Sequence, residues 1–253
     1  MSALIELKNV TNRFGEETVH DGVNLAIMQN ETLGLVGGSG SGKSVLLRTM
    51  IGLNAPQEGE VLVDGTDLYK LSPEERLNIQ ERWGVLFQNG ALFSGLSVLD
   101  NIALPLREHT DMSRDTIEDL SFTKLQMVGL KAEAADKRPS ELSGGMITRA
   151  GVARAMALDP DILFLDEPTG ALDPTAASSL DELMRSLHEV LNLSILIITH
   201  DPNTLVTVCD RIAMIVDKKV ESGSLDEMLR SKNEKIRSYF GDERVKAALA
   251  KRQ

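Results

Sequence analysis

Gly37–Gly38–Ser39–Gly40–Ser41–Gly42–Lys43–Ser44 is the stretch of sequence that decides the fold. It fits the pattern G-x-x-x-x-G-K-[ST], follows an apolar run at residues 32–36 that predicts a strand, and opens a helical pattern over about residues 43–52. The glycines let the backbone point its N–H groups inward around phosphates, and the helix adds its positive N-terminal end. Lys43 supplies a charge to the β- and γ-phosphates, and the Ser44 hydroxyl can bind Mg²⁺. The stretch therefore predicts a site for ATP with Mg²⁺.

Composition narrows the class of protein. The chain has 253 residues with 42% hydrophobic content and only 4% aromatic residues, so we expect a sizeable and mostly aliphatic core. The net charge of −11 argues against nucleic acid as the main partner, because nucleic-acid binders present a basic face. The single cysteine, Cys209, excludes an internal disulfide and favours a reducing compartment, and we expect it to be a small buried residue.

The sequence does not predict a secretory leader or a membrane span. Residues 1–10 lack a basic region followed by a long apolar run. Apolar stretches such as residues 162–165 and 195–198 are much shorter than the ~20 residues that cross a bilayer. We therefore expect a cytosolic protein whose membrane role depends on a partner.

The order of predicted elements indicates an α/β fold. Alternating apolar residues over residues 5–27 predict an opening edge strand and a second strand of the same kind. Later strands alternate with helices, which implies a largely parallel sheet covered on both faces. Between about residues 96 and 158 the pattern is helical, in three segments broken at Pro105, Gly129 and Pro139. We therefore predict a P-loop NTPase (RecA-like) core with a parallel sheet, an antiparallel β edge and an inserted helical subdomain. The predicted divisions are an ATP-binding core at residues 1–87 and 159–223, a helical insert at 88–158 and a basic C-terminal tail at 224–253.

The tail differs from the rest of the chain in charge. It carries eight basic and five acidic residues, whereas the remainder is acidic. One interpretation is a pair of solvated helices. The alternative is a strap that lies on an acidic neighbour, most simply a second copy of the chain.

Two acidic residues end the apolar run at residues 162–165. Asp166 is placed to hold the water shell of Mg²⁺ beside Ser44, and Glu167 is placed to polarise an attacking water. Two carboxylates at this position can also cap the next helix. The phosphate loop upstream favours the catalytic interpretation.

A second anion-binding pattern occurs at Leu142–Ser143–Gly144–Gly145–Met146. Ser143 can donate its hydroxyl and Gly145 its backbone N–H, and both precede a helical pattern over residues 146–158. A simple N-cap followed by glycines is the alternative.

Together these motifs resemble those of the ABC ATPase family, over nearly all of residues 1–223. The family's order is present in full: Phe14, the phosphate loop, Gln88, Ser143, Asp166 with Glu167, Asp173 and His200. In that family the signature segment of one subunit closes on the γ-phosphate held by the other. The resemblance therefore implies a homodimer that encloses two Mg·ATP molecules and drives separate transmembrane permease subunits.

The resemblance also implies roles for individual residues. Phe14 stacks on adenine, with Val19 on the same side, and Gln88 reaches Mg²⁺ and the attacking water. Asp173 links the two sites across the dimer, and His200 contacts the γ-phosphate. The remaining histidines, His20, His109 and His188, are expected to be structural.

Two features suggest a subgroup. Met146 stands where the family usually has glutamine, and the loop at residues 86–98 is unusual. These two features and residues 101–107 together resemble the ATPases of MCE-type phospholipid transport systems. Ala91, Leu92, Phe93 and Leu96 are apolar, as expected of a groove that receives a helix from a transmembrane subunit, although ordinary core packing is the alternative. The resemblance also implies MCE-domain lipid-binding and small accessory subunits, and a location on the cytoplasmic face of the inner membrane.

Other interpretations remain open. The stretch at residues 167–173 also resembles export-type ATPases, so an ABC ATPase for another cargo (lipoprotein, amino acid or drug) is the main alternative. A soluble ABC protein of DNA repair or translation is disfavoured by the short spacing between Lys43 and Ser143, the single cassette and the acidic charge. A small-molecule kinase is disfavoured because it needs no second γ-phosphate site.

Overall fold

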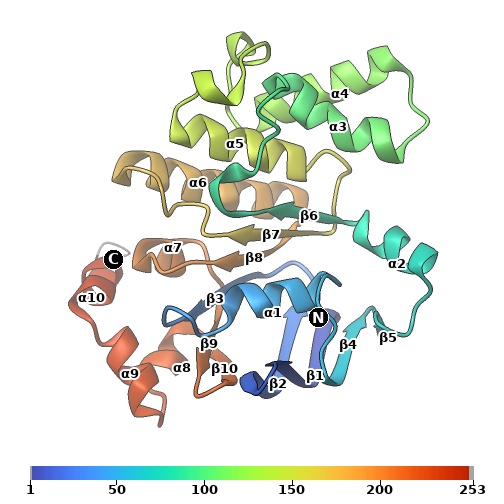
Figure 1. Cartoon of the computed structure of the whole chain (residues 1–253). Coiled ribbons are helices and arrows are strands. Elements are labelled where there is room, and N and C mark those ends of the chain that lie inside the picture. Colours follow the sequence, from blue (N-terminus) through green and yellow to red (C-terminus); the bar gives the residue numbers. More distant parts are fainter. Residues whose placement is uncertain (1, 251–253) are drawn as a thin grey trace.

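The computed structural model describes residues 2–250 of the chain. Its larger sheet has six strands in the order β10-β9-β3-β8-β7-β6. All neighbouring strands in it are parallel except the antiparallel pair β9 and β10. The bounds are β3 Thr32–Gly37, β6 Trp83–Leu86, β7 Ile162–Asp166, β8 Ser194–Ile198, β9 Arg211–Val216 and β10 Lys219–Gly223. The predicted α/β fold with a largely parallel sheet is confirmed (Figure 1).

The antiparallel part is a separate sheet of four strands in the order β2-β1-β4-β5. Its strands are β1 Ala3–Phe14, β2 Glu17–Met28, β4 Glu58–Val63 and β5 Thr66–Asp67. The prediction that the first strand lies at an edge is wrong, because β1 pairs with β2 on one side and with β4 on the other. Alternation of apolar residues identifies the buried face of a strand but not its neighbours, so the sequence could not place β1 in the interior.

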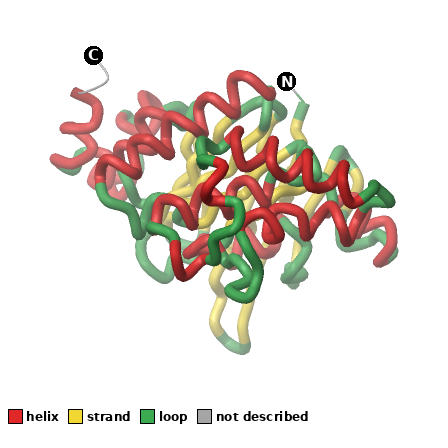
Figure 2. The backbone as a smooth tube through the Cα atoms, turned by 90° about the horizontal axis from the view of Figure 1, so that it is seen from above, coloured by secondary structure: helices red, strands yellow, loops and turns green. Residues whose placement is uncertain are grey.

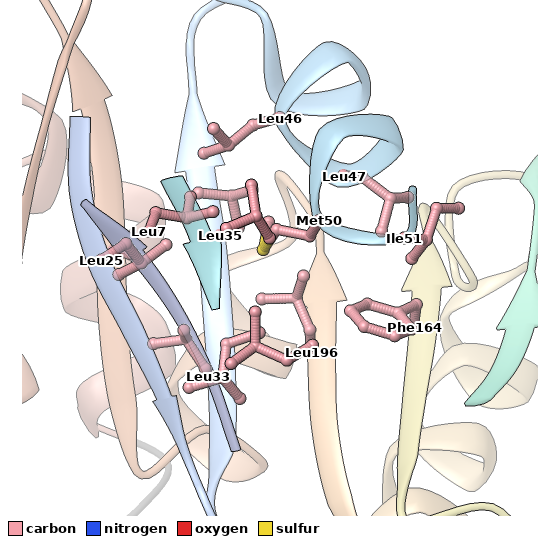
Figure 3. Packing of buried hydrophobic residues seen from close by; sticks show 14 of the residues in the cluster. Leu7, Leu25, Leu33, Leu35, Leu46, Leu47, Met50, Ile51, Phe164 and Leu196 are labelled. Atoms are coloured by element: carbon pink, nitrogen blue, oxygen red, sulfur yellow. The ribbon is translucent and has the colours of Figure 1, made fainter. Parts of the chain in front are cut away.

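Helix α1, Lys43–Met50, packs between the two sheets. Figure 3 shows Leu7 of the antiparallel sheet and Leu35 of β3 facing the α1 side chains Leu47 and Met50. Apart from Phe164, the buried members of this cluster are aliphatic. The expected aliphatic core is therefore confirmed for the described residues. This packing fixes the start of α1, and therefore the phosphate loop, at the carboxyl end of β3.

The opposite face of the larger sheet is covered by α6, Pro174–Leu191, and by a group of helices that Figure 1 shows beyond β6 and β7. Figure 2 views the molecule from that side, with the helices lying over the strands. This group comprises α3 Val98–His109, α4 Arg114–Met127 and α5 Gly144–Ala155, with short 3₁₀ turns η1 Gln88–Gly90, η2 Ala132–Ala134 and η3 Pro139–Glu141. Helix α7, Pro202–Thr207, follows β8.

Two local features differ from the sequence prediction. Helix α3 continues through Pro105 instead of breaking there, because Ile102, Ala103 and Leu106 on either side of the proline are buried and hold both turns in place. Helix α2, Pro73–Gln80, was not predicted. Ser72 and Glu75 form a capping box at its start, and this spacing is a signal that could have revealed it.

The described part of the C-terminal tail, residues 224–250, packs on its own chain, so its interpretation as a pair of solvated helices is wrong. It forms three helices, α8 Leu225–Leu229, α9 Glu234–Phe240 and α10 Glu243–Ala250. Met228, Ile236, Phe240 and Val245 are buried in a cluster with residues of β9 and α7. The basic charge of the tail suggested exposed helices. The apolar residues that anchor these helices are single residues between basic ones, so they form no apolar run that would predict burial.

The first prediction concerns this tail. Phe240→Ala is expected to lower the free energy of unfolding by about 3–5 kcal/mol, because Phe240 is fully buried and its truncation leaves a cavity. Chemical denaturation of the purified chain measures the change. Val190→Ala is the control, since Val190 is 77% exposed and its truncation should change stability by no more than about 0.5 kcal/mol. Equal stability of Phe240→Ala and the unmodified chain would show that the tail does not contribute to the fold.

Cys209 lies between α7 and β9, with its sulfur against Gly34: a methyl group added to Gly34 would come within 2.8 Å of Sγ. Part of the residue reaches the surface, but burial of the thiol raises its pKa. Within residues 2–250, no helix combines the length and the apolar character needed to cross a membrane.

Candidate functional site

The phosphate loop joins β3 to α1. Gly40 and Gly42 have φ values of +74° and +97°, conformations that favour glycine and that turn the loop into the helix. Lys43 bends back over the loop, and its ammonium group donates to the carbonyl oxygens of Gly37 and Gly38 at 2.9 and 3.1 Å. Gly42 is the N-cap of α1 and provides no side-chain acceptor, so the first N–H groups of the helix stay available for an anion.

Ser44 and Asp166 meet beside this loop. Oγ of Ser44 donates to Oδ2 of Asp166 at 3.4 Å, although the two residues are 122 positions apart in the chain. Burial raises the pKa of Asp166, and the Ser44 hydrogen bond and the charges of Lys43 and Arg48 partly oppose that shift. Mg²⁺ at nucleotide sites is held by one or two protein oxygens together with phosphates and water, and this pair fits that donor set.

Glu167 follows β7 with φ +52°, a left-handed conformation that is uncommon outside glycine and asparagine. Its backbone N–H donates to the carbonyl of Ile198 at 2.9 Å, which ties it to the end of β8. Nδ1 of His200 lies 2.6 Å from Oε2 of Glu167, a close approach of two polar atoms that lacks hydrogen-bond alignment. Neighbouring parallel strands therefore bring the predicted base and the predicted histidine together.

A cavity of about 340 Å³ joins these groups. Lys43, Ser44, Asp166, Glu167, His200 and Gln88 all line it. Oε2 of Glu167 is buried in this cavity without a hydrogen-bond partner among the described residues, and so is Oγ of Ser41 in the adjoining phosphate loop. A buried polar atom without a partner is costly unless a ligand or water satisfies it, so the cavity fits a polar, phosphate-bearing molecule with Mg²⁺.

The signature segment lies outside this cavity. Ser143 is the N-cap of α5 and is exposed, as is Gly144, and its hydroxyl oxygen accepts from the N–H of Met146 at 3.3 Å. The segment rests beside residues 171–176 of the same chain: a methyl group added to Gly145 would lie 3.6 Å from Cβ of Ala176. Asp173 belongs to that neighbouring segment and caps α6 by accepting from two backbone N–H groups at 3.0 Å.

Phe14 and Val19 come from the β1–β2 hairpin. Phe14 is 50% exposed near the hairpin tip, and Val19 lies against the phosphate loop, because Cγ1 of Val19 is 2.5 Å from the position that a Cβ on Gly42 would take. The hairpin and the phosphate loop are thus adjacent, although neither Phe14 nor Val19 lines the cavity that holds Glu167.

Arg154 and Asn101 hold the loop beside the site, and the sequence patterns predicted this role for neither of them. Arg154 of α5 donates to the carbonyls of Ala91 and Gly90 at 2.8 and 3.2 Å, and its guanidinium lies 5.8 Å from the centre of the Phe93 ring. Asn101 is fully buried; its amide binds the backbone N–H and carbonyl of Phe93 at 2.8 and 3.1 Å. These two side chains hold the loop that follows Gln88. No local motif signals such contacts, because their partners are backbone atoms of another segment.

The second prediction tests this attachment. Arg154→Met is expected to increase amide hydrogen exchange at residues 90–93 and to lower stability by about 1–3 kcal/mol, because the substitution removes two charge-assisted hydrogen bonds to the loop. Exchange measured by mass spectrometry resolves the segment. Arg149→Met is the matched control on the same helix, since Arg149 binds Val128 and Ser179 instead. Unchanged exchange in Arg154→Met would mean that the loop is held without it.

These features define a phosphate-loop site for a nucleotide with Mg²⁺, with Ser143 of the Leu142–Met146 segment exposed outside it. The chain matches the ABC transporter family over residues 20–170 and belongs to that family. It is an ABC-type ATPase that binds ATP with Mg²⁺ and serves a transport system.

Individual relatives agree with this family and differ in cargo. The chain is 39% identical to the intermembrane phospholipid transport system ATP-binding protein MlaF of Haemophilus influenzae, over 95% of this chain and 91% of that one. It is 41% identical to the probable ribonucleotide transport ATP-binding protein mkl of Mycobacterium leprae, over 97% and 71%. It is 39% identical to the methionine import ATP-binding protein MetN 1 of Paraburkholderia xenovorans, over 94% and 71%.

Among solved structures, the ATP-binding cassette MJ0796, a dimer bound to ADP and Pi, matches with a TM-score of 0.79 at 33% identity, covering 87% of this chain and 98% of that one. The fold and the enzyme class predicted from the motifs are therefore confirmed.

Proposed function

We propose that this chain is the ATPase subunit of a phospholipid transporter and that two copies enclose two Mg·ATP molecules. One observation supports this nucleotide-sandwich dimer. Lys43 and Ser44 line the cavity, whereas Ser143 and Gly145 lie outside it, and Ser143 is exposed at the start of α5. An exposed serine and bare backbone at a helix N-terminus suit a phosphate that another subunit presents. The dimeric cassette structures among the neighbours support this arrangement.

The residues of the cavity suggest how hydrolysis proceeds. Ser44 and Asp166, with Gln88 close by, would hold Mg²⁺, which would supply positive charge to neutralise the phosphates. Lys43 binds the β- and γ-phosphates, and Glu167 accepts the proton of the attacking water. His200, close to Glu167, contacts the γ-phosphate and orients the water. Asp173 connects the two sites across the dimer, and Phe14 with Val19 binds the adenine.

We propose that residues 88–158 move as a unit against the core formed by residues 1–87 and 159–223. Arg154 fastens the loop after Gln88 to α5, whose first residues carry the signature. Closure on the γ-phosphate would therefore displace this loop together with Ser143. The basic tail, residues 224–253, is proposed to stabilise the core.

The membrane contact is proposed to lie at the same loop. Phe93 is 54% exposed, stands on Arg154 and is held by Asn101, which suits an anchor for a helix of a permease subunit. Leu92 packs partly against the core, so the core-packing interpretation holds for that residue. Through such a contact the chain would lie on the cytoplasmic face of the inner membrane, with MCE-domain and small accessory subunits as further partners.

Phospholipid is the cargo we favour, because the MlaF relative aligns over nearly its full length and the Gln88 loop resembles that subgroup. The mkl and MetN relatives, named for ribonucleotide and methionine transport, keep another cargo as a second candidate. Purification of the tagged chain from its native membranes, followed by mass spectrometry of bound small molecules, separates the candidates. Enrichment of phospholipid over a tag-only preparation is expected. Enrichment of an amino acid or nucleotide cargo without phospholipid would contradict the proposal.

The third prediction concerns the permease contact in the same preparation. Phe93→Asp is expected to reduce copurified membrane subunits by roughly tenfold or more, because a charge replaces an exposed aromatic side chain that the proposed permease helix would bury. Leu53→Asp is the control: Leu53 is 62% exposed and follows the C-terminal end of α1. Equal recovery of membrane subunits with both variants would place the contact elsewhere.

A further inference from the structure

His20 is a buried histidine beneath the phosphate loop. It lies on β2 opposite Asn12 of β1, and its side chain is fully buried. Burial lowers the pKa of His20 to about 4, so the ring is neutral at neutral pH. The roles assigned to the nucleotide site do not include this residue, and a buried imidazole at such a position needs an explanation.

Asn12 fixes the orientation and the tautomer of the His20 ring. The amide nitrogen of Asn12 lies 3.0 Å from Nδ1 of His20, and since an amide nitrogen only donates, Nδ1 must accept and Nε2 must carry the proton. The other end of the Asn12 amide accepts from Thr49 at 3.3 Å and from Asn54 at 3.4 Å. An inverted Asn12 amide would set its NH₂ group against the NH₂ group of Asn54, so the Asn54 contact favours this arrangement, whereas the Thr49 hydroxyl accommodates either one.

The far side of the ring contacts the phosphate loop. A Cβ on Gly42 would lie 2.6 Å from Nε2 of His20 and 2.5 Å from Cγ1 of Val19. His20 therefore sits directly against the residue that caps α1, while Asn12 binds Thr49 in the last turn of the same helix. The hairpin thus touches both ends of α1 through two polar side chains.

The same hairpin carries the proposed adenine contacts. Val19 is the residue before His20, and Phe14 is two residues beyond Asn12. A nucleotide can bind the hairpin through its base and the phosphate loop through its phosphates. It gains the full affinity of both contacts only if the distance between hairpin and phosphate loop is fixed before binding.

We propose that His20 is a positioning residue that holds the β1–β2 hairpin at a fixed distance from the phosphate loop, so that base and phosphates of one nucleotide bind together. This inference rests on the proposed adenine contact of Phe14. It assigns His20 no contact with the nucleotide itself.

Two ligands that differ only in the nucleoside test the inference. Mg·ADP reaches both the hairpin and the phosphate loop, whereas Mg·pyrophosphate reaches the phosphate loop alone, and neither is hydrolysed. Dissociation constants come from calorimetry for ADP and from competition against ADP for pyrophosphate. His20→Leu keeps an apolar side chain under Gly42 but leaves the Asn12 amide without its acceptor. The expected result is about tenfold weaker ADP binding with less than a twofold change for pyrophosphate.

A second variant and a control complete the design. His20→Asn keeps an acceptor for Asn12 but is too short to reach Gly42, and it too should weaken ADP selectively. His188→Leu removes a histidine that binds the carbonyl of Leu193 instead, and it should leave both constants unchanged. Circular dichroism and thermal melting establish that each variant is folded.

The outcomes separate the inference from the proposed function. In a Phe14→Ala background, adding His20→Leu should weaken ADP by clearly less than it does in the unmodified chain, because the hairpin has then lost the aromatic contact with adenine that His20 positions. Equal weakening of ADP and pyrophosphate, or no change in either, would overturn the role of His20. Unchanged ADP affinity in Phe14→Ala alone would instead refute the adenine contact.

Discussion

Lys43→Ala is expected to weaken Mg·ATP binding by about 100-fold or more. The ammonium group of Lys43 rests on the carbonyls of Gly37 and Gly38, at the edge of the cavity, and can turn from them to the phosphates. Loss of a charged donor to a buried phosphate costs about 3 kcal/mol, which corresponds to that factor. Titration calorimetry or displacement of a fluorescent ATP analogue measures the affinity.

Lys70→Ala is the control for that experiment. Lys70 is an exposed lysine paired with Glu60 and Asp67, and its loss should leave ATP affinity unchanged. Tight ATP binding by Lys43→Ala would refute the assignment of the phosphate loop.

Glu167→Gln is expected to lower turnover by about 10²–10⁴-fold while ATP still binds. Glutamine preserves the shape of the side chain beside His200 but cannot accept a proton from water. Because ATP then remains intact between the two copies, gel filtration with Mg·ATP should show a dimer that the unmodified chain does not accumulate. Phosphate release assays measure the turnover.

Glu118→Gln is the matched change on an exposed position of α4, and it should alter neither turnover nor the elution volume. A Glu167→Gln variant that stays strictly monomeric at high concentration with ATP would contradict the sandwich. Full turnover in that variant would remove Glu167 from the mechanism.

The parts of the site that could be predicted from sequence are those formed by short, contiguous segments of the chain. The phosphate loop combines a strand, glycines and a helix start within a dozen residues, and Asp166 with Glu167 follows a buried strand directly. The parallel strands β3, β8 and β7 end at the same edge of the sheet, so the meeting of Ser44 with Asp166, and of Glu167 with His200, follows from topology.

The parts that could not be predicted depend on contacts between distant segments. The helix through Pro105 is held by packing on its neighbours, which a local rule for proline ignores. Arg154, Asn101 and His20 act on backbone or side-chain groups of other segments, and nothing in their own surroundings in the sequence marks them. The tail misled the prediction for the same reason, since its anchors are single apolar residues between charges.

The position of Cys209 against Gly34 has a practical consequence for testing the proposed movement of residues 88–158. A thiol with a raised pKa holds little thiolate at neutral pH, and thiolate is the species that reacts with maleimides. The native chain therefore behaves nearly as a cysteine-free background. One new cysteine at an exposed position of α4 and another on the core would accept a fluorescent donor and acceptor, so that opening and closing could be timed in single molecules without first removing Cys209.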